Sequence, residues 1–203
     1  EGLPRPRHLQ PVREYLVKEW GAEVCDGIVA DDALGMAAVS GTTICSLDKD
    51  LLQIPGLHYN FVNREFREIN ELEGWFNFYS QLVLGDRADN VPGYDGKMRP
   101  KWPKFLSNVR MALDGAKSPY DMYVEVERLY REAKTDDVLV RNARLLYIWR
   151  KENDAWQVPV KSELQPPTQL DISLEEKQGV ETKLESTVMK QVETSPSTVR
   201  GFT

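Results

Sequence analysis

One helix dominates what this chain can fold into. Six apolar residues recur at helical spacing between Asn70 and Gly85, namely Leu72, Trp75, Phe76, Tyr79, Leu82 and Val83. Asn70, followed by Glu73 three residues later, is typical of a helix N-terminus, and Gly85 is typical of a helix end. An apolar stripe of this width has to be covered by other elements. The sequence therefore predicts a central helix over residues 71–84 whose aromatic side chains form the core.

Shorter elements are predicted on both sides of this helix. Upstream, the spacing predicts a helix over 9–20 that Gly21 ends, strands over 22–25 and 42–47, a helix at about 31–38 between them, and a strand over 57–62 that leads into 64–69. Downstream, helices are expected at about 102–113, 119–133 and 137–150. The pattern indicates an α/β fold with a small parallel α/β half followed by a helical half.

Composition separates a third part. Residues 161–203 contain one aromatic residue, Phe202, among many polar ones, so we expect a disordered tail there. No apolar run approaches the roughly 18 residues that span a bilayer, so a membrane protein is not expected. The two cysteines, Cys25 and Cys45, are too few for a disulfide framework or a four-cysteine zinc site.

Three groups of aspartates stand at the ends of predicted elements. Asp31 and Asp32 open a helix, Asp48 and Asp50 follow a strand, and Asp86 and Asp89 follow the aromatic helix. Any one pair alone is also typical of a helix cap. Together, however, clustered carboxylates repel one another unless cations neutralise them, and oxygen ligands favour Mg²⁺ or Mn²⁺. Two such ions suit in-line attack on a phosphodiester.

The same segments carry a resemblance to a known family. The strings GIVADDALGMAA, CSLDKDLLQIPGLHYN and LVLGDRADNVPGYDGK resemble, in order, three motifs of bacteriophage 5′→3′ exonucleases. These flap-endonuclease-like enzymes are related to the 5′-nuclease domain of bacterial DNA polymerase I. The resemblance runs from about Arg5 to Trp156. It implies that residues 1–84 are the C-terminal part of a PIN-like, Rossmann-like 5′-nuclease catalytic domain, and that residues 85–160 form a helix-hairpin-helix subdomain.

The resemblance also implies a metal site. Asp31, Asp32, Asp48 and Asp50 correspond to ligands of a first Mg²⁺ or Mn²⁺ ion. Asp86 and Asp89 correspond to the ligands of a second ion, with Asp50 shared. Of these, Asp31, Asp48, Asp50, Asp86 and Asp89 are implied to be catalytic. Lys49 has two interpretations, a contact to phosphate or an offset to the charge of its neighbouring carboxylates, and we expect the second.

A DNA-binding segment is implied directly after the third motif. In the family, main-chain N–H groups of a glycine turn hold the duplex backbone, around a monovalent cation. The corresponding glycines are Gly93 and Gly96, and the basic residues Lys97, Arg99, Lys101 and Lys104 follow them. These side chains are expected to contact phosphates. A solvated basic helix start is the alternative interpretation of the same residues.

The implied function is that of a metal-dependent 5′→3′ exonuclease or flap endonuclease in phage DNA replication or degradation. Its expected location is the cytoplasm of the infected bacterium. Its implied partners are DNA with 5′ ends, flaps or nicks, and RNA in hybrids. Val29 stands where the family usually has Glu, and the family's N-terminal strands have no counterpart in this chain. The alternatives are therefore an inactive DNA-binding remnant, or one chain of a split nuclease whose partner supplies those strands.

Overall fold

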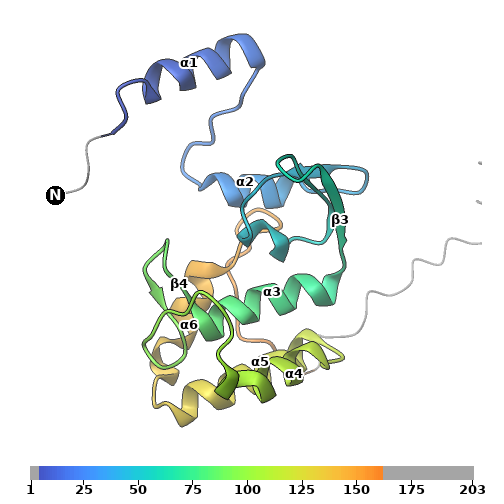
Figure 1. Cartoon of the computed structure of the whole chain (residues 1–203), viewed down its shortest axis with the longest axis vertical. Coiled ribbons are helices and arrows are strands. Elements are labelled where there is room, and N and C mark those ends of the chain that lie inside the picture. Colours follow the sequence, from blue (N-terminus) through green and yellow to red (C-terminus); the bar gives the residue numbers. More distant parts are fainter. Residues whose placement is uncertain (1–4, 162–203) are drawn as a thin grey trace, which may run out of the picture. The chain divides into compact units, whose positions relative to one another are not determined.

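The computed structural model describes residues 5–161, and Figure 1 shows the order of their elements. The elements are α1 (Leu9–Trp20), α2 (Ala30–Ala37), β1 (Thr43–Cys45), the 3₁₀ helix η1 (Asp50–Gln53), β2 (Gly56–Asn60), β3 (Glu65–Ile69), α3 (Glu71–Leu84), β4 (Gly85–Asp86), β5 (Val91–Pro92), the 3₁₀ helix η2 (Lys104–Leu106), α4 (Ser107–Asp114), α5 (Pro119–Glu132) and α6 (Asp136–Leu146). The predicted α/β character is confirmed. The predicted tail lies outside the described residues, except for residue 161.

α3 is the central helix that its sequence predicts. The Asn70 side chain accepts a hydrogen bond of 2.9 Å from the Glu73 backbone N–H, and Gly85 ends the helix with φ of +76°. Phe78, Tyr79, Leu82 and Val83 are fully buried. The helix forms because its cap and its apolar stripe are both local features of the sequence.

The helical half packs against α3. Buried side chains from α3, α4, α5 and α6 form one continuous apolar core, which also contains Trp156. Two hydrogen bonds tie the layers together: the Tyr130 hydroxyl donates to the Leu82 carbonyl at 2.8 Å, and the Asn142 amide donates to the Pro92 carbonyl at 2.9 Å. A second, smaller core of Ile44, Leu51, Ile54 and Ile148 lies beneath the sheet strands and η1.

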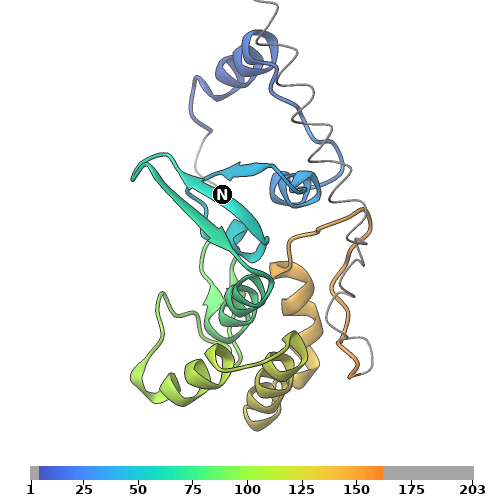
Figure 2. The same cartoon turned by 90° about the vertical axis from the view of Figure 1, so that its right-hand side faces the viewer.

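The sheet is mixed, whereas a parallel one was expected. Its order is β1-β2-β3, with β1 parallel to β2 and β2 antiparallel to β3. Figure 2 shows β2 and β3 as the long hairpin. Only residues 61–64 connect these two strands, and Arg64 has φ of +59°. A parallel pair needs a crossover of a dozen or more residues, so this connection can only form a hairpin.

Of two elements predicted near the N-terminus, the structure confirms the helix but not the strand. Residues 22–25 are exposed and irregular, so the predicted strand is wrong; within the described residues no neighbouring strand pairs with them. The helix at Leu9–Trp20 is confirmed, and Gly21 ends it in the left-handed conformation. Its apolar face is nevertheless exposed, with 74% of Trp20 accessible.

Two helices in the second half are shorter than predicted. The helix expected from residue 102 begins at Lys104, after Pro103, as a 3₁₀ turn. The helix expected to reach residue 150 ends at Leu146, where an extended segment begins. We call residues 147–156 the strap. Among residues 5–161, none of the helices combines the length and the apolar composition that a bilayer span requires.

The strap connects the helical half with the α/β half. The Arg150 guanidinium donates to the Glu71 carboxylate at 2.6 Å and to the Gln53 carbonyl at 3.0 Å. It also lies 4.7 Å from the centre of the Trp75 ring. These contacts hold the strap against α3 and η1. The described residues accordingly fall within one compact unit.

Candidate metal centre and nucleic-acid interface

Three of the predicted aspartates converge. Asp50 opens η1, Asp86 lies in β4 directly after α3, and Asp89 lies in the turn between β4 and β5. One carboxylate oxygen from each lies within 4.8 Å of the others. Asp86 is buried, Asp50 half-buried and Asp89 exposed. Two oxygens on one Mg²⁺ are at most about 4.2 Å apart, so a small side-chain adjustment lets this all-oxygen set hold a hard cation.

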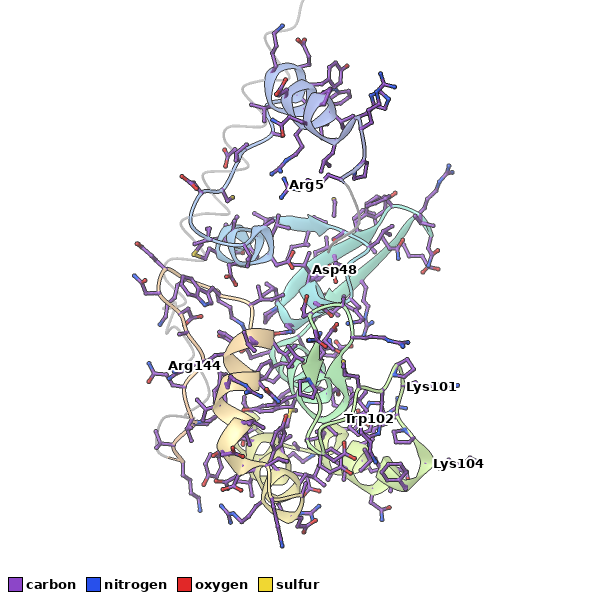
Figure 3. The ribbon with its side chains drawn as sticks, turned by 90° about the vertical axis from the view of Figure 1, so that its left-hand side faces the viewer. Arg5, Asp48, Lys101, Trp102, Lys104 and Arg144 are labelled. Atoms are coloured by element: carbon purple, nitrogen blue, oxygen red, sulfur yellow. The ribbon has the colours of Figure 1, made fainter. Side chains whose placement is uncertain are left out.

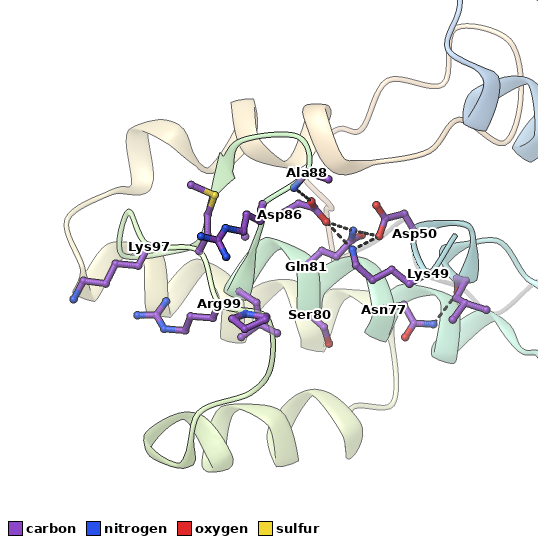
Figure 4. Close-up of a pocket in the computed structure, with 15 residues that line it drawn as sticks. Lys49, Asp50, Asn77, Ser80, Gln81, Asp86, Ala88, Lys97 and Arg99 are labelled. Carbon is purple, nitrogen blue, oxygen red and sulfur yellow. Dashed lines mark hydrogen bonds and ion pairs between the residues drawn. The ribbon is translucent and has the colours of Figure 1, made fainter. Parts of the chain in front are cut away.

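Lys49 already places a positive charge in this cluster. Its ammonium lies 2.5 Å from Asp50 Oδ1 and 2.7 Å from Asp86 Oδ2, as Figure 4 shows. Both ion pairs agree with the expectation that Lys49 offsets the charge of its neighbouring carboxylates. Partial burial would lower the pKa of Lys49, but its two carboxylate partners raise it above its usual value.

The two carboxyls that share Lys49 have opposite pKa shifts. Burial raises the pKa of Asp50. Lys49 lowers it, but the charges of Asp86 and Asp48 offset part of that lowering, so the pKa stays above its usual value. Burial alone would also raise the pKa of Asp86. The Lys49 ammonium and the backbone N–H groups of Ala88 and Asp89 instead lower it. Asp86 is thus held as an anion by donors that surround it.

Two glutamines complete the cluster, and the sequence interpretation did not include them. Gln81 Nε2 donates to Asp50 Oδ1 at 2.5 Å and to Asp86 Oδ2 at 3.3 Å. Gln53 Nε2 in turn donates to Gln81 Oε1 at 2.5 Å, which fixes the orientation of the Gln81 amide. The sequence offers only a weak signal for Gln81, namely an amide side chain near the end of an apolar helix, five residues before Asp86.

Asp31 and Asp48 lie beside this cluster. Asp31 is half-buried in the first turn of α2. Burial raises its pKa first, and the charges of Asp48, Asp32 and Asp89 raise it further. Asp48 is exposed, and its Oδ1 accepts a hydrogen bond of 3.0 Å from the Asp50 backbone N–H. The aspartates predicted for the two metal ions are therefore close enough to affect one another's charge.

Asp32 has a different environment from its neighbour. Its Oδ1 accepts a hydrogen bond of 2.8 Å from the backbone N–H of Trp149 in the strap. The two consecutive aspartates thus have different partners. Trp149 was not predicted to bear on the site, because 117 residues separate it from Asp32 and no local pattern links them.

The glycine turn after β5 is hydrogen-bonded within itself. The Gly93 N–H donates to the Lys97 carbonyl at 2.8 Å, and the Gly96 N–H donates to the Gly93 carbonyl at 3.0 Å. β5 precedes the turn and an irregular segment with Pro100 and Pro103 follows it, so helices do not flank it directly on both sides. Proline lacks an N–H and restricts the residue before it, which prevents a helix there. The arrangement differs here from the helix-hairpin-helix that the resemblance implies.

The four basic residues after the turn divide into two kinds. Arg99 makes two hydrogen bonds to the Asp95 carboxylate, at 2.8 and 2.5 Å, and only 14% of its side chain is exposed. Lys97, Lys101 and Lys104 are exposed, and Figure 3 shows Lys101 and Lys104 at the outer edge of the fold. Arg99 is therefore held by its own segment, whereas the three lysines can meet a ligand.

One pocket joins the acidic cluster to the basic segment. It has a volume of about 820 Å³, and Asp50 and Asp86 line one end, with Lys97 and Arg99 at the other. Figure 4 shows these side chains around the pocket, with Ser80 and Gln81 of α3 between Arg99 and Asp50. A single ligand can thus contact both groups.

Comparison with protein-family models, curated proteins and solved structures finds no match for this chain. The chemistry of the site therefore has to be inferred from its own residues.

Proposed function

We propose that this protein is a metal-dependent 5′-nuclease that hydrolyses DNA phosphodiester bonds at 5′ ends or flaps. The observation that carries the proposal is the convergence of Asp50, Asp86 and Asp89, with oxygens within 4.8 Å of one another. Asp31 and Asp48 add their charges from neighbouring elements. This many carboxylates in one place is costly without cations, and divalent ions with oxygen preference fit them.

The carboxylates would form two neighbouring ion sites. Asp50, Asp86 and Asp89 would hold one, and Asp31 and Asp48 would help hold the other. A bound pair of Mg²⁺ ions supplies an activated water and stabilises the leaving 3′-oxygen of a phosphodiester. Lys49 offsets part of the negative charge of the cluster until a divalent ion binds. Because 68% of its side chain is exposed, it has room to turn outwards.

DNA recognition is assigned to the exposed lysines beside the pocket. Because the Gly93 and Gly96 N–H groups donate within the turn, phosphate contacts fall to Lys97, Lys101 and Lys104. Lys97 lines the same pocket as Asp50 and Asp86. A strand that crosses this pocket brings its phosphate towards the carboxylates while its flanking phosphates meet the lysines.

The test is cleavage of a 5′-labelled flap and a nicked duplex by the 203-residue chain, in Mg²⁺ and in EDTA. The expected result is Mg²⁺-dependent release of short 5′ products. Asp86→Asn should lower the rate at least about 1,000-fold, on the order of 4 kcal/mol of transition-state stabilisation. Asp114→Asn, an exposed aspartate at the end of α4, is the matched control and should cleave at the wild-type rate. Cleavage that Asp86→Asn leaves unchanged would overturn the proposal.

A second candidate function is non-catalytic DNA binding. The observation that favours it is Lys49, which satisfies Asp50 and Asp86 without a metal ion. In that case the folded wild-type chain binds duplex DNA in EDTA and does not cleave it in Mg²⁺ or Mn²⁺. Asp86→Asn would then bind DNA at least as tightly as the wild type, because a negative charge is removed near the phosphates. Metal-dependent cleavage excludes this candidate.

A further inference from the structure

α2 is seated on the strap at two points that lie one helical turn apart. The first is the hydrogen bond of 2.8 Å from the Trp149 N–H to Asp32 Oδ1. The second is Gly35, where an added Cβ would lie 2.2 Å from the Trp149 carbonyl oxygen and 2.9 Å from Ile148 Cγ2. Residues three apart share one face of a helix. That face of α2 therefore rests directly on Ile148 and Trp149.

Asp31 projects from another face of the same helix turn. Successive residues of an α-helix are about 100° apart, so Asp31 cannot share the contact that Asp32 makes. Burial raises the pKa of Asp31, and the nearby charges of Asp48, Asp32 and Asp89 raise it further. The rotation of α2 on the strap consequently decides whether Asp31 faces the acidic cluster.

The strap holds α2 in a fixed position because the strap itself is hydrogen-bonded to η1, the element that carries Asp50. Arg150, the residue after Trp149, donates to the Gln53 carbonyl at the end of η1. The same guanidinium pairs with Glu71 at the start of α3. Through these bonds the strap sets the position of α2 relative to η1, the 3₁₀ helix that Asp50 opens.

We propose that Asp32 is a positioning residue, whose hydrogen bond to the Trp149 amide holds α2 on the strap and presents Asp31 to the acidic cluster. The inference rests on the proposed function, in which Asp31 helps hold a metal ion. It also separates Asp32 from the ligands. A hydrogen-bond acceptor needs an oxygen, which Asn also provides, whereas a metal ligand at this site needs the negative charge of Asp.

The experiment compares Asp32→Asn, Asp32→Ala and Asp31→Asn in the full chain. Hydrogen exchange of the Trp149 amide is measured in EDTA, and Mn²⁺ binding is measured by the loss of the free-ion electron paramagnetic resonance signal. Asp32→Ala should speed Trp149 exchange at least about tenfold, while the two Asn variants exchange like the wild type. Mn²⁺ affinity should fall at least about tenfold in Asp32→Ala and Asp31→Asn, and stay within about threefold of the wild type in Asp32→Asn.

Gly35→Ala is a second way to move α2 away from the strap. It keeps every carboxylate but forces the α2 backbone away from Trp149. It should therefore speed Trp149 exchange and weaken Mn²⁺ binding as Asp32→Ala does. Thermal unfolding of each variant shows that the chain is folded when these values are measured.

Two results would overturn the inference. The first is Mn²⁺ binding as weak in Asp32→Asn as in Asp31→Asn, which would make Asp32 a ligand. The second is unchanged Trp149 exchange in Asp32→Ala. Failure of the proposed function gives a different result: the wild-type chain would bind no Mn²⁺. The hydrogen bond between Asp32 and Trp149 is tested separately, because Trp149 exchange is measured without metal.

Discussion

The ammonium of Lys49 lies 2.7 Å from Asp86 Oδ2, although the two residues are 37 positions apart in the chain. The contact brings the segment after β1 to the segment after α3. Because only 4% of the Asp86 side chain is exposed, its charge depends on the donors around it. Lys49 is thus a resident cation in a cluster that can also hold a divalent one. The two cations are expected to compete.

Replacing Lys49 tests this competition. Lys49→Met should lower the free energy of unfolding in EDTA by about 1 to 2 kcal/mol, because the buried Asp86 carboxylate loses a charged partner. Mn²⁺ should then stabilise the variant more than it stabilises the wild type, since no ammonium has to be displaced. Urea unfolding in EDTA and in Mn²⁺ measures both effects. Lys97→Met, an exposed lysine of the same pocket, is the control.

Equal Mn²⁺ stabilisation of the wild type and of Lys49→Met would show that Lys49 and the ion do not share the site. A smaller Mn²⁺ effect in the variant would contradict the competition directly, because it would mean that Lys49 assists metal binding.

The glycine turn gives a second prediction. A Cβ at Gly93 would lie 2.4 Å from the Val83 carbonyl oxygen, whereas a Cβ at Gly96 meets nothing within 4 Å. Gly93→Ala should therefore cost roughly 3 kcal/mol of stability, because backbone would have to move. The methyl group of Gly96→Ala has room, but Ala would adopt the left-handed φ of +76°, at a cost of about 1 kcal/mol. Thermal unfolding of both variants measures the difference, and equal costs would contradict the close contact at Gly93.

Local features of the sequence were sufficient to predict α3. Its N-cap at Asn70, its apolar stripe and its end at Gly85 all lie within sixteen consecutive positions, roughly the length over which such signals act. The placement of Asp50 with Asp86 and Asp89 was expected from the resemblance, which assigns them to one metal site, and the structure brings the three carboxylates together. Gln81 was missed because only its distance from Asp50 and Asp86, and not its local sequence, reveals its role.

The strap could not be predicted, because its contacts connect distant parts of the chain. Helical periodicity continues past Leu146, yet the chain becomes extended where Ile148 enters the small core and Trp149 meets Asp32. The same dependence on tertiary contacts explains residues 22–25. Their short apolar sequence is typical of a strand, but a strand needs a neighbour to pair with.

The Arg99–Asp95 pair gives a prediction about pH. The Arg99 guanidinium lowers the pKa of Asp95, so folding favours the ionised carboxyl. The stability from this pair is complete above the unfolded pKa, near 3.9, and is lost as the pH falls through the lower folded pKa. Asp95→Asn should cost about 1 to 2 kcal/mol at neutral pH. The difference from the wild type should shrink below about pH 4.

Urea unfolding between pH 2 and pH 7 measures this difference for Asp95→Asn, with Asp114→Asn as the control that lacks an arginine partner in the described residues. A difference that stays constant across this range would show that the charge of Asp95 contributes nothing to the pair.

The exposed lysines give the last prediction, on the salt dependence of DNA binding. Each phosphate contact to a duplex adds about 0.9 to the slope of log affinity against log salt. Replacing Lys97, Lys101 and Lys104 together by Ala should therefore reduce this slope by up to about 3 and weaken duplex binding at low salt. Fluorescence anisotropy over a salt series measures both. Lys151→Ala, an exposed lysine of the strap, should leave the slope unchanged. If the triple variant keeps the wild-type slope, the basic segment beside the pocket is not the phosphate-binding surface, and Arg99 cannot replace it while its guanidinium is bound to Asp95.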